Sequence, residues 1–398
     1  MSSEAVKNPG HVEVSAGLKM FFYFLAGVGA AAFLYALKTD PARAWSSYLT
    51  GHFYFLSLAV GGLFFVAVQF ATGAMWSAPI RRIAESFTAY LPIALVTGAI
   101  LYFGIHDLYH WSHPDVVKGD PVLEGKASYL SVGFFMIRNL LSIALWWAFA
   151  RGIVGNSIAQ DKNGAFEWTV KNRKLAPGFL ILFALTYTMA SFDLLMSLDP
   201  HWFSTIFGVY CFAGLFYSTL ALLCILTARL YANSTLNGIV NENHFHDIGK
   251  FMFAFTVFWA YIGFSQFILI WYANLPEETG YFLKRMNSGW MGVSIFLMFG
   301  KFFAPFFVLL PRAAKRNPVL LTGVAAFMMV AQWVDVIWMV QPEFVGSAAG
   351  PRLGLTEVGI FLGFTGLFGS AVSRFMGRHN AVAIGDPRLA ESVHHHHQ

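Results

Sequence analysis

Ten long apolar segments constrain the fold of this chain more than any other feature. A membrane-spanning helix needs about 20 largely apolar residues, and the sequence holds ten such runs, at 18–37, 49–74, 87–106, 132–150, 176–198, 205–228, 251–273, 288–310, 319–340 and 355–376. Only 12% of the residues are charged, about half of the roughly 25% typical of soluble domains. The two-residue alternation of a membrane β-barrel is absent from these runs. The sequence therefore predicts an all-α integral membrane protein with ten transmembrane helices.

The domain organisation follows from the same segments. Residues 1–17 form a polar N-terminal segment without the apolar stretch of a signal peptide, 18–376 form the membrane domain, and 377–398 form a C-terminal tail. The longest expected loops, 107–131 and 151–175, are too short to hold a soluble domain. No basic stripe of the kind that binds nucleic acid is present, so a nucleic-acid partner is not expected.

The distribution of lysine and arginine predicts the orientation. These residues accumulate in loops on the cytoplasmic side of a membrane. If the N-terminus is cytoplasmic, 17 of the 26 Lys and Arg residues lie in inside segments, seven lie in outside segments, and the other two lie within helices. We therefore expect both termini to be cytoplasmic.

Ionisable side chains that interrupt or end the apolar segments are the first candidates for function. A charge in hydrocarbon costs a few kcal/mol or more, so such residues usually face the protein interior or a wet cavity. Counting along the predicted helices places seven of them in the outer third of the membrane, namely His52, His106, Asp107, Arg138, Asp193, Asp335 and Glu357. Lys301 falls in the inner half, and Glu85 falls at the cytoplasmic edge of the third helix. The sequence thus predicts an outer cluster with one inner lysine.

Several of these residues have a structural interpretation beside the functional one. Asp193 lies within an apolar helix, where it can act in proton chemistry or form a structural pair with Arg138. Gln266 lies at mid-membrane depth, where an amide usually bonds to a neighbouring helix. Lys301 can extend toward the inner surface or belong to a proton relay. The proline one turn later leaves a backbone carbonyl free for a local polar group or a water molecule. Asp335 shares a helix face with a glutamine three residues before it.

Metal and haem ligands are scarce. A haem held by two imidazoles would have only His52 and His106, and both lie at interfacial depth. The two cysteines, Cys211 and Cys224, lie thirteen residues apart in one apolar segment, which is not a zinc or iron–sulfur spacing. We expect no metal site and no covalently bound cofactor.

Four sequence stretches carry a resemblance to a known family. They are WSAPIRRIAESFTAYLPI, LYHWSHP, FDLLMSLDPHWFSTIFGVYCFAG and DIGKFMFAFTVFWAYIGFSQFILIWYANLPEETGYFLKR. Together they closely resemble the ActF membrane subunits of bacterial alternative complex III, which belong with the NrfD/PsrC-like membrane subunits. The resemblance extends from about residue 18 to 376.

The resemblance implies a fold, a location and a set of partners. The fold would be two four-helix bundles, formed by helices 2–5 and 6–9, with helices 1 and 10 at the flanks. Complexes of this family lie in the bacterial cytoplasmic membrane, oxidise menaquinol at its outer side, and pass electrons to iron–sulfur clusters and c-type haems in other subunits. The implied partners are the NrfD-like paralogue ActC, an iron–sulfur protein, c-type cytochromes, a terminal oxidase and membrane lipid. The better-supported quinol site of such complexes lies in ActC.

The function expected from the resemblance is that of a cofactor-free membrane subunit of a quinol:cytochrome c oxidoreductase. Such a subunit would support menaquinol oxidation and would form a proton-conducting path. The candidate quinol-proton acceptors and path residues are His52, His106, Asp107, Asp193, Asp335, Glu357, Lys301, Glu85 and Gln266, with Arg138 as their charge partner. Two alternatives stay open, a purely structural subunit of the same complex and a stand-alone secondary transporter, which would place its substrate site at broken helices near the midplane.

Overall fold

The chain is an all-α integral membrane protein. The computed structural model describes residues 8–286, 288–345 and 350–395, so parts of the expected terminal segments, 1–7 and 396–398, lie outside the described residues. Within the described part, regular structure is helical except for one isolated bridge between His11 and Asn380. Ten helices in this part are long and apolar enough to cross a membrane, which confirms the predicted fold class.

The spans are single helices or short series of helices. They are α1 (Ala16–Thr39), α2 (Pro41–Thr72), α3 (Arg81–Phe87) with α4 (Leu91–Ile100) and α5 (Ile105–Leu108), α8 (Val132–Asn163), α9 (Phe166–Leu194), α10 (Phe207–Ala232), α11 (Glu242–Ala273), α13 (Met291–Phe296) with a π-helix (Leu297–Phe303) and α14 (Ala304–Leu309), α16 (Pro318–Val340) and α17 (Leu355–Met376). The shorter helices between them are α6 (Pro114–Val117), α7 (Pro121–Lys126), α12 (Pro276–Met286) and α15 (Arg312–Arg316). A further short helix, α18 (Leu389–Val393), follows the last span.

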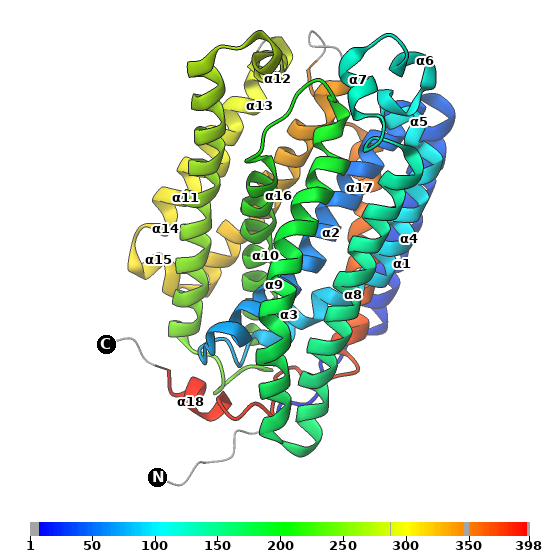
Figure 1. Cartoon of the computed structure of the whole chain (residues 1–398). Coiled ribbons are helices and arrows are strands. Elements are labelled where there is room, and N and C mark those ends of the chain that lie inside the picture. Colours follow the sequence, from blue (N-terminus) through cyan, green and yellow to red (C-terminus); the bar gives the residue numbers. More distant parts are fainter. Residues whose placement is uncertain (1–7, 287, 346–349, 396–398) are drawn as a thin grey trace.

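One expected loop is wrong. Residues 151–175 are helical apart from the turn at 164–165, because α8 continues to Asn163 and α9 begins at Phe166. Gly164 ends α8 with a left-handed backbone (φ 63°), a conformation that glycine adopts without strain. The apolar pattern marks only the membrane-embedded part of each helix, so it misses the polar helical turns beyond it. These turns project at the lower end of the molecule in Figure 1.

The ten spans form the two expected bundles with two flanking helices. In the first bundle α8 packs on α9 and on α4, and α2 packs on α9. In the second, α10 packs on α11 and on α16. The flanking helices α1 and α17 make the most extensive helix pair, in which a Cβ on Gly29 would overlap the backbone of Gly363. Small residues let two membrane helices approach closely and gain dispersion contacts.

The two ends of the molecule differ. The first and last described residues and α18 lie at one end, which we name the terminal end, and α6, α7 and α12 lie at the opposite end (Figure 1). At the terminal end Val12 bonds to the last turn of α17 and Ala381 bonds to Gly10. The tail after α17 is therefore folded onto the helices in its described part.

Candidate functional site

A fully buried group of polar residues lies at the centre of the second bundle. The Lys301 Nζ is 2.6 Å from Asp335 Oδ2 and 2.6 Å from Gln332 Oε1. The Tyr210 hydroxyl donates to Asp335 Oδ1 at 2.6 Å, and the Trp259 Nε1 donates to Oδ2 at 3.2 Å. We call these five residues the Lys301 cluster. It joins α10, α11, α16 and the π-helix.

The local sequence explains how Lys301 reaches this position. Pro305 has no N–H, so it cannot bond to the carbonyl of Lys301 four residues earlier. Tyr217 of α10 instead donates its hydroxyl to that carbonyl at 3.2 Å. Directly before the proline, Leu297–Phe303 widens to a π-helix, a feature found often at functional sites. Of the two partners expected for the free carbonyl, a polar group and water, the structure shows a polar group.

The expected separation of Lys301 from Asp335 is corrected. Helix counting separated it from Asp335, but the structure pairs the two side chains. The helix begins at Met291, so Lys301 lies ten residues, or about 15 Å, from the opposite end of the span. Asp335 lies only five residues before the end of α16, and the long lysine side chain closes the remaining distance. Lys301 is 0% exposed and Asp335 is 1% exposed.

The second buried pair lies in the first bundle, between α8 and α9. Arg138 binds Asp193 through two parallel hydrogen bonds of 2.9 Å, from Nε and Nη2. A third donor, Nη1, bonds to the Tyr129 carbonyl at 2.9 Å, and the guanidinium lies 3.8 Å from the Tyr129 ring centroid. Asn139 adds a longer contact to the same carboxylate at 3.4 Å. Asp193 had two interpretations, proton chemistry and a structural pair with Arg138. The structure shows the contacts of the structural pair.

Glu85 lies at the terminal end inside a buried group of arginines. Its carboxylate is 3.5 Å from Arg81 and 3.2 Å from Arg82, and it accepts from Ser157 at 2.7 Å. Arg81 also contacts Asp386 of the tail at 2.6 Å. Burial alone raises the pKa of Asp386, but the charges of Arg81 and a second arginine outweigh it and lower the pKa to about 2. Glu85 is thus part of an ion-pair network that holds the tail.

The histidines and Asp107 divide among separate groups. His52 is buried and its Nδ1 lies 2.9 Å from the hydroxyl of Thr97 on α4. His106 is exposed and its Nδ1 lies 3.0 Å from the hydroxyl of Ser112. Asp107 is exposed. The contacts of these residues do not connect them to the Lys301 cluster, so the expected single outer cluster is corrected to several local groups.

Glu357 and Gln266 have different surroundings again. Arg43 of α2 binds both oxygens of Glu357, at 2.6 and 2.8 Å, and the Gly354 N–H caps one of them at 2.8 Å. Glu357 therefore connects the start of α17 to the start of α2.

Gln266 is buried, and its Nε2 has no hydrogen-bond partner among the residues that the structure describes. The expected bond from this amide to a neighbouring helix is not seen there.

Three aromatic members of the site were not among the predicted residues. Tyr210, Tyr217 and Trp259 all contact Lys301 or Asp335, and the Lys301 Nζ lies 4.0 Å from the Trp259 ring centroid, where a cation–π attraction operates. The seven-residue spacing of the two tyrosines places them on one helix face. This spacing is visible in the sequence and could have indicated that the two tyrosines line the same site.

Comparisons with known proteins add no identity. A scan against models of protein families finds no match, and no curated protein matches the chain. The resemblance to alternative complex III therefore stays a prediction. In the described part of the chain, no group of three or more His, Cys, Asp or Glu residues is arranged to hold a metal ion, and both cysteines are buried as free thiols.

Proposed function

We propose that this chain is a cofactor-free membrane subunit of a bacterial quinol:electron-acceptor oxidoreductase, which supports menaquinol oxidation and moves protons through its second bundle. The observation that carries the proposal is the Lys301 cluster. A buried lysine and carboxylate in contact, deep in a membrane span, are rare and mark proton or ion pathways in membrane proteins. In this proposal the terminal end is cytoplasmic and the opposite end is periplasmic.

The chemistry of the cluster suits proton transfer. Quinol oxidation releases two protons and two electrons, and the proposal assigns the electrons to partner subunits. An acceptor within hydrogen-bond reach must take each proton. Asp335 can accept a proton, and its contact with Lys301 lets that proton be held at either Oδ2 or Nζ. Tyr210 bonds to the other oxygen of Asp335, so its hydroxyl provides the next transfer step on α10.

The groups beyond Tyr210 point to the opposite end as the side of exchange. Trp202 stacks on Tyr281 of α12 with ring centroids 3.8 Å apart, directly beyond the start of α10. On the same short helix, Lys284 contacts Asp199 at 2.7 Å and Glu343 at 2.8 Å. Burial lowers the pKa of Lys284, but the two carboxylates outweigh it and raise the pKa above its usual value. A proton leaving the cluster on this side would meet titratable groups at the surface.

A second candidate function is a purely structural subunit of the same complex. Its support is that three of the predicted acids are already held by arginine, namely Asp193 by Arg138, Glu357 by Arg43, and Glu85 by Arg81 and Arg82. An arginine keeps its proton under physiological conditions, so these pairs serve packing well and proton transfer poorly. On this evidence we place the proton role on Lys301 and Asp335, with Tyr210 as the next transfer step, and not on the acids held by arginine.

Proton release per electron distinguishes the two functions. The assembly that copurifies with the chain in mild detergent would be reconstituted in vesicles and supplied with a soluble menaquinol analogue. We expect Asp335→Asn to lower the ratio of protons released to electrons transferred, while subunit composition stays the same. Glu357→Gln is the matched control and should leave the ratio unchanged.

Two results would contradict the proposal. An unchanged ratio in Asp335→Asn, with the assembly intact, would leave the structural function as the better account. A lone, colourless and monodisperse protein that transports a solute would instead support a secondary transporter.

A further inference from the structure

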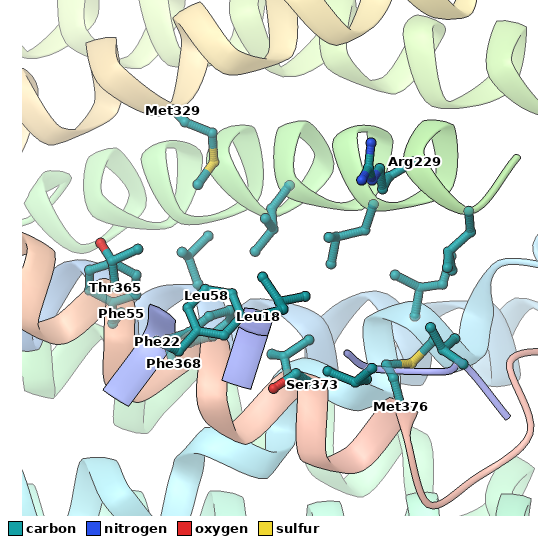
Figure 2. Close-up of a pocket in the computed structure, with 18 of the residues that line it drawn as sticks. Leu18, Phe22, Phe55, Leu58, Arg229, Met329, Thr365, Phe368, Ser373 and Met376 are labelled. Atoms are coloured by element: carbon teal, nitrogen blue, oxygen red, sulfur yellow. The ribbon is translucent and has the colours of Figure 1, made fainter. Parts of the chain in front are cut away.

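A cavity of about 580 Å³ lies between the two bundles and the flanking helices, apart from the Lys301 cluster. Its walls come from α1, α2, α10, α16 and α17 (Figure 2). Met329 and Thr365 lie toward one end of it, and Arg229 and Met376 lie toward the other, at the terminal end (Figure 2). The volume is within the range of sites that bind small molecules.

The length and lining of the cavity match one leaflet of a membrane. From Phe361 to Met376 the α17 wall runs for fifteen residues, or about 22 Å. Half of a bilayer, with its headgroup region included, is about 20–22 Å. Between these two ends the walls are mainly aliphatic and aromatic, with Leu58, Leu222 and Phe368 among them. A hydrocarbon chain lying along the helices would make apolar contacts with these walls, whereas a hydrated solute would not.

The end of the cavity at the terminal end of the molecule, which we call its mouth, is polar and charged. Arg229, in the last turn of α10, forms no ion pair within the described residues and is exposed. Ser15 caps the first turn of α1 beside the same cavity, so the positive end of that helix lies there too. Glu13 is a third member of the mouth. A phosphate suits Arg229 and the start of α1, and an ammonium group suits Glu13.

We propose that this cavity is a binding site for one glycerophospholipid of the leaflet at the terminal end. One acyl chain occupies the apolar length of the cavity, and the phosphate pairs with Arg229. The charge at the mouth decides between the two classes of long-chain lipid that the walls accept. An isoprenoid quinone carries a neutral headgroup and leaves Arg229 unpaired, whereas a phospholipid places its phosphate there, where charge-assisted hydrogen bonds are strongest. The proposal does not depend on the proposed respiratory function.

Photolabelling tests the site directly. The full chain, with whatever subunits copurify, would be placed in nanodiscs of phosphatidylcholine that contain a small fraction of phosphatidylethanolamine with a diazirine at the end of one acyl chain. After irradiation, peptide mass spectrometry locates the label. We expect labelling near Leu222 and Thr365, at the deep end of the cavity, above that at the lipid-exposed Leu185 on α9.

Two matched pairs of variants test the headgroup and the cavity separately. Arg229→Gln should reduce deep-end labelling about tenfold, the effect of losing one charge-assisted contact. Arg151→Gln, which removes an exposed cation on α8 outside the cavity, should leave the labelling unchanged. Leu226→Trp fills the cavity and should abolish the labelling, whereas Leu185→Trp should not. Elution profile and thermal unfolding would show that each variant is folded.

Specific results would overturn the proposal. Deep-end labelling no higher than at Leu185 would show that the cavity holds no acyl chain. Equal labelling in the wild type, Arg229→Gln and Leu226→Trp would have the same meaning. Preferential labelling of the deep end by a diazirine-bearing isoprenoid quinone, with the labelled phospholipid excluded, would replace the phospholipid by a quinone.

Discussion

A double-mutant cycle on Lys301 and Asp335 tests whether their contact is a true buried ion pair. Lys301→Met removes the cation and leaves the carboxylate with its two other donors, Tyr210 and Trp259. Asp335→Asn removes the negative charge and leaves the ammonium with the amide oxygen of Gln332. The double variant removes both charges while keeping side chains of similar size.

The burial of the pair sets the magnitude. With exposed fractions of 0% and 1%, neither charge can be hydrated in a single variant without a change in structure. Breaking a buried pair by removing one partner costs about 3–5 kcal/mol. Lys301→Met should fall near the lower value, because Asp335 keeps two donors, and Asp335→Asn near the upper value. The double variant should cost less than the sum by about 3 kcal/mol or more, because it leaves no charge unpaired.

The assay is reversible unfolding of the purified chain in mixed micelles with increasing denaturing detergent. A parallel cycle on Arg43 and Glu357 is the matched control. That pair has two hydrogen bonds where Lys301 and Asp335 share one. The Arg43 side chain is 31% exposed, however, so the interaction energy of that pair should be about 1 kcal/mol or less. If the Lys301–Asp335 cycle is additive to within about 0.5 kcal/mol, the reasoning from burial is refuted.

Three further predictions follow from other contacts. Tyr210→Phe should lower stability by about 1.5–3 kcal/mol in the same assay, because a donor to a buried carboxylate is lost. Gly29→Ala should loosen α1, as measured by protease cleavage of residues 8–40, while Gly27→Ala should not, since a Cβ there meets open space. Asp386 has its pKa lowered from 3.8 to about 2, with Arg81 the strongest lowering partner. Its roughly 2 kcal/mol of stabilisation is therefore present at neutral pH and lost as pH falls from about 4 to 2. Hydrogen exchange should show Asp386→Asn weakening the tail at pH 7 but not at pH 2.

Features that depend on neighbours along the chain could be predicted from the sequence. Hydrophobic runs gave the ten spans, because each helix must satisfy its own backbone in lipid. The proline after Lys301 predicted a free carbonyl, and the three-residue spacing of Gln332 and Asp335 predicted a shared face. In the structure both side chains contact the same Nζ. These predictions needed only the period of a helix and the missing N–H of proline.

Features that depend on rotation around the helix axes could not be predicted. Residues at equal depth can face different neighbours, so His52, Asp193 and Glu357 lie at similar expected depth but bind different partners. Glu357 pairs with an arginine 314 positions away, and no local pattern indicates that pairing. The π-helix adds a further shift, because a wider turn changes the direction of every side chain after it.

The two buried pairs have the same place in their bundles but different chemistry. Each joins the last two helices of its bundle, through Arg138 and Asp193 in the first and Lys301 and Asp335 in the second. The guanidinium of Arg138 binds both oxygens of Asp193 and keeps its proton, so the first pair can hold its two helices together but cannot pass a proton on. The ammonium contacts one oxygen, leaves the other to Tyr210, and can give up a proton. A shared architecture can therefore hold a fixed pair in one bundle and a titratable pair in the other, which restricts the proposed proton chemistry to the second bundle.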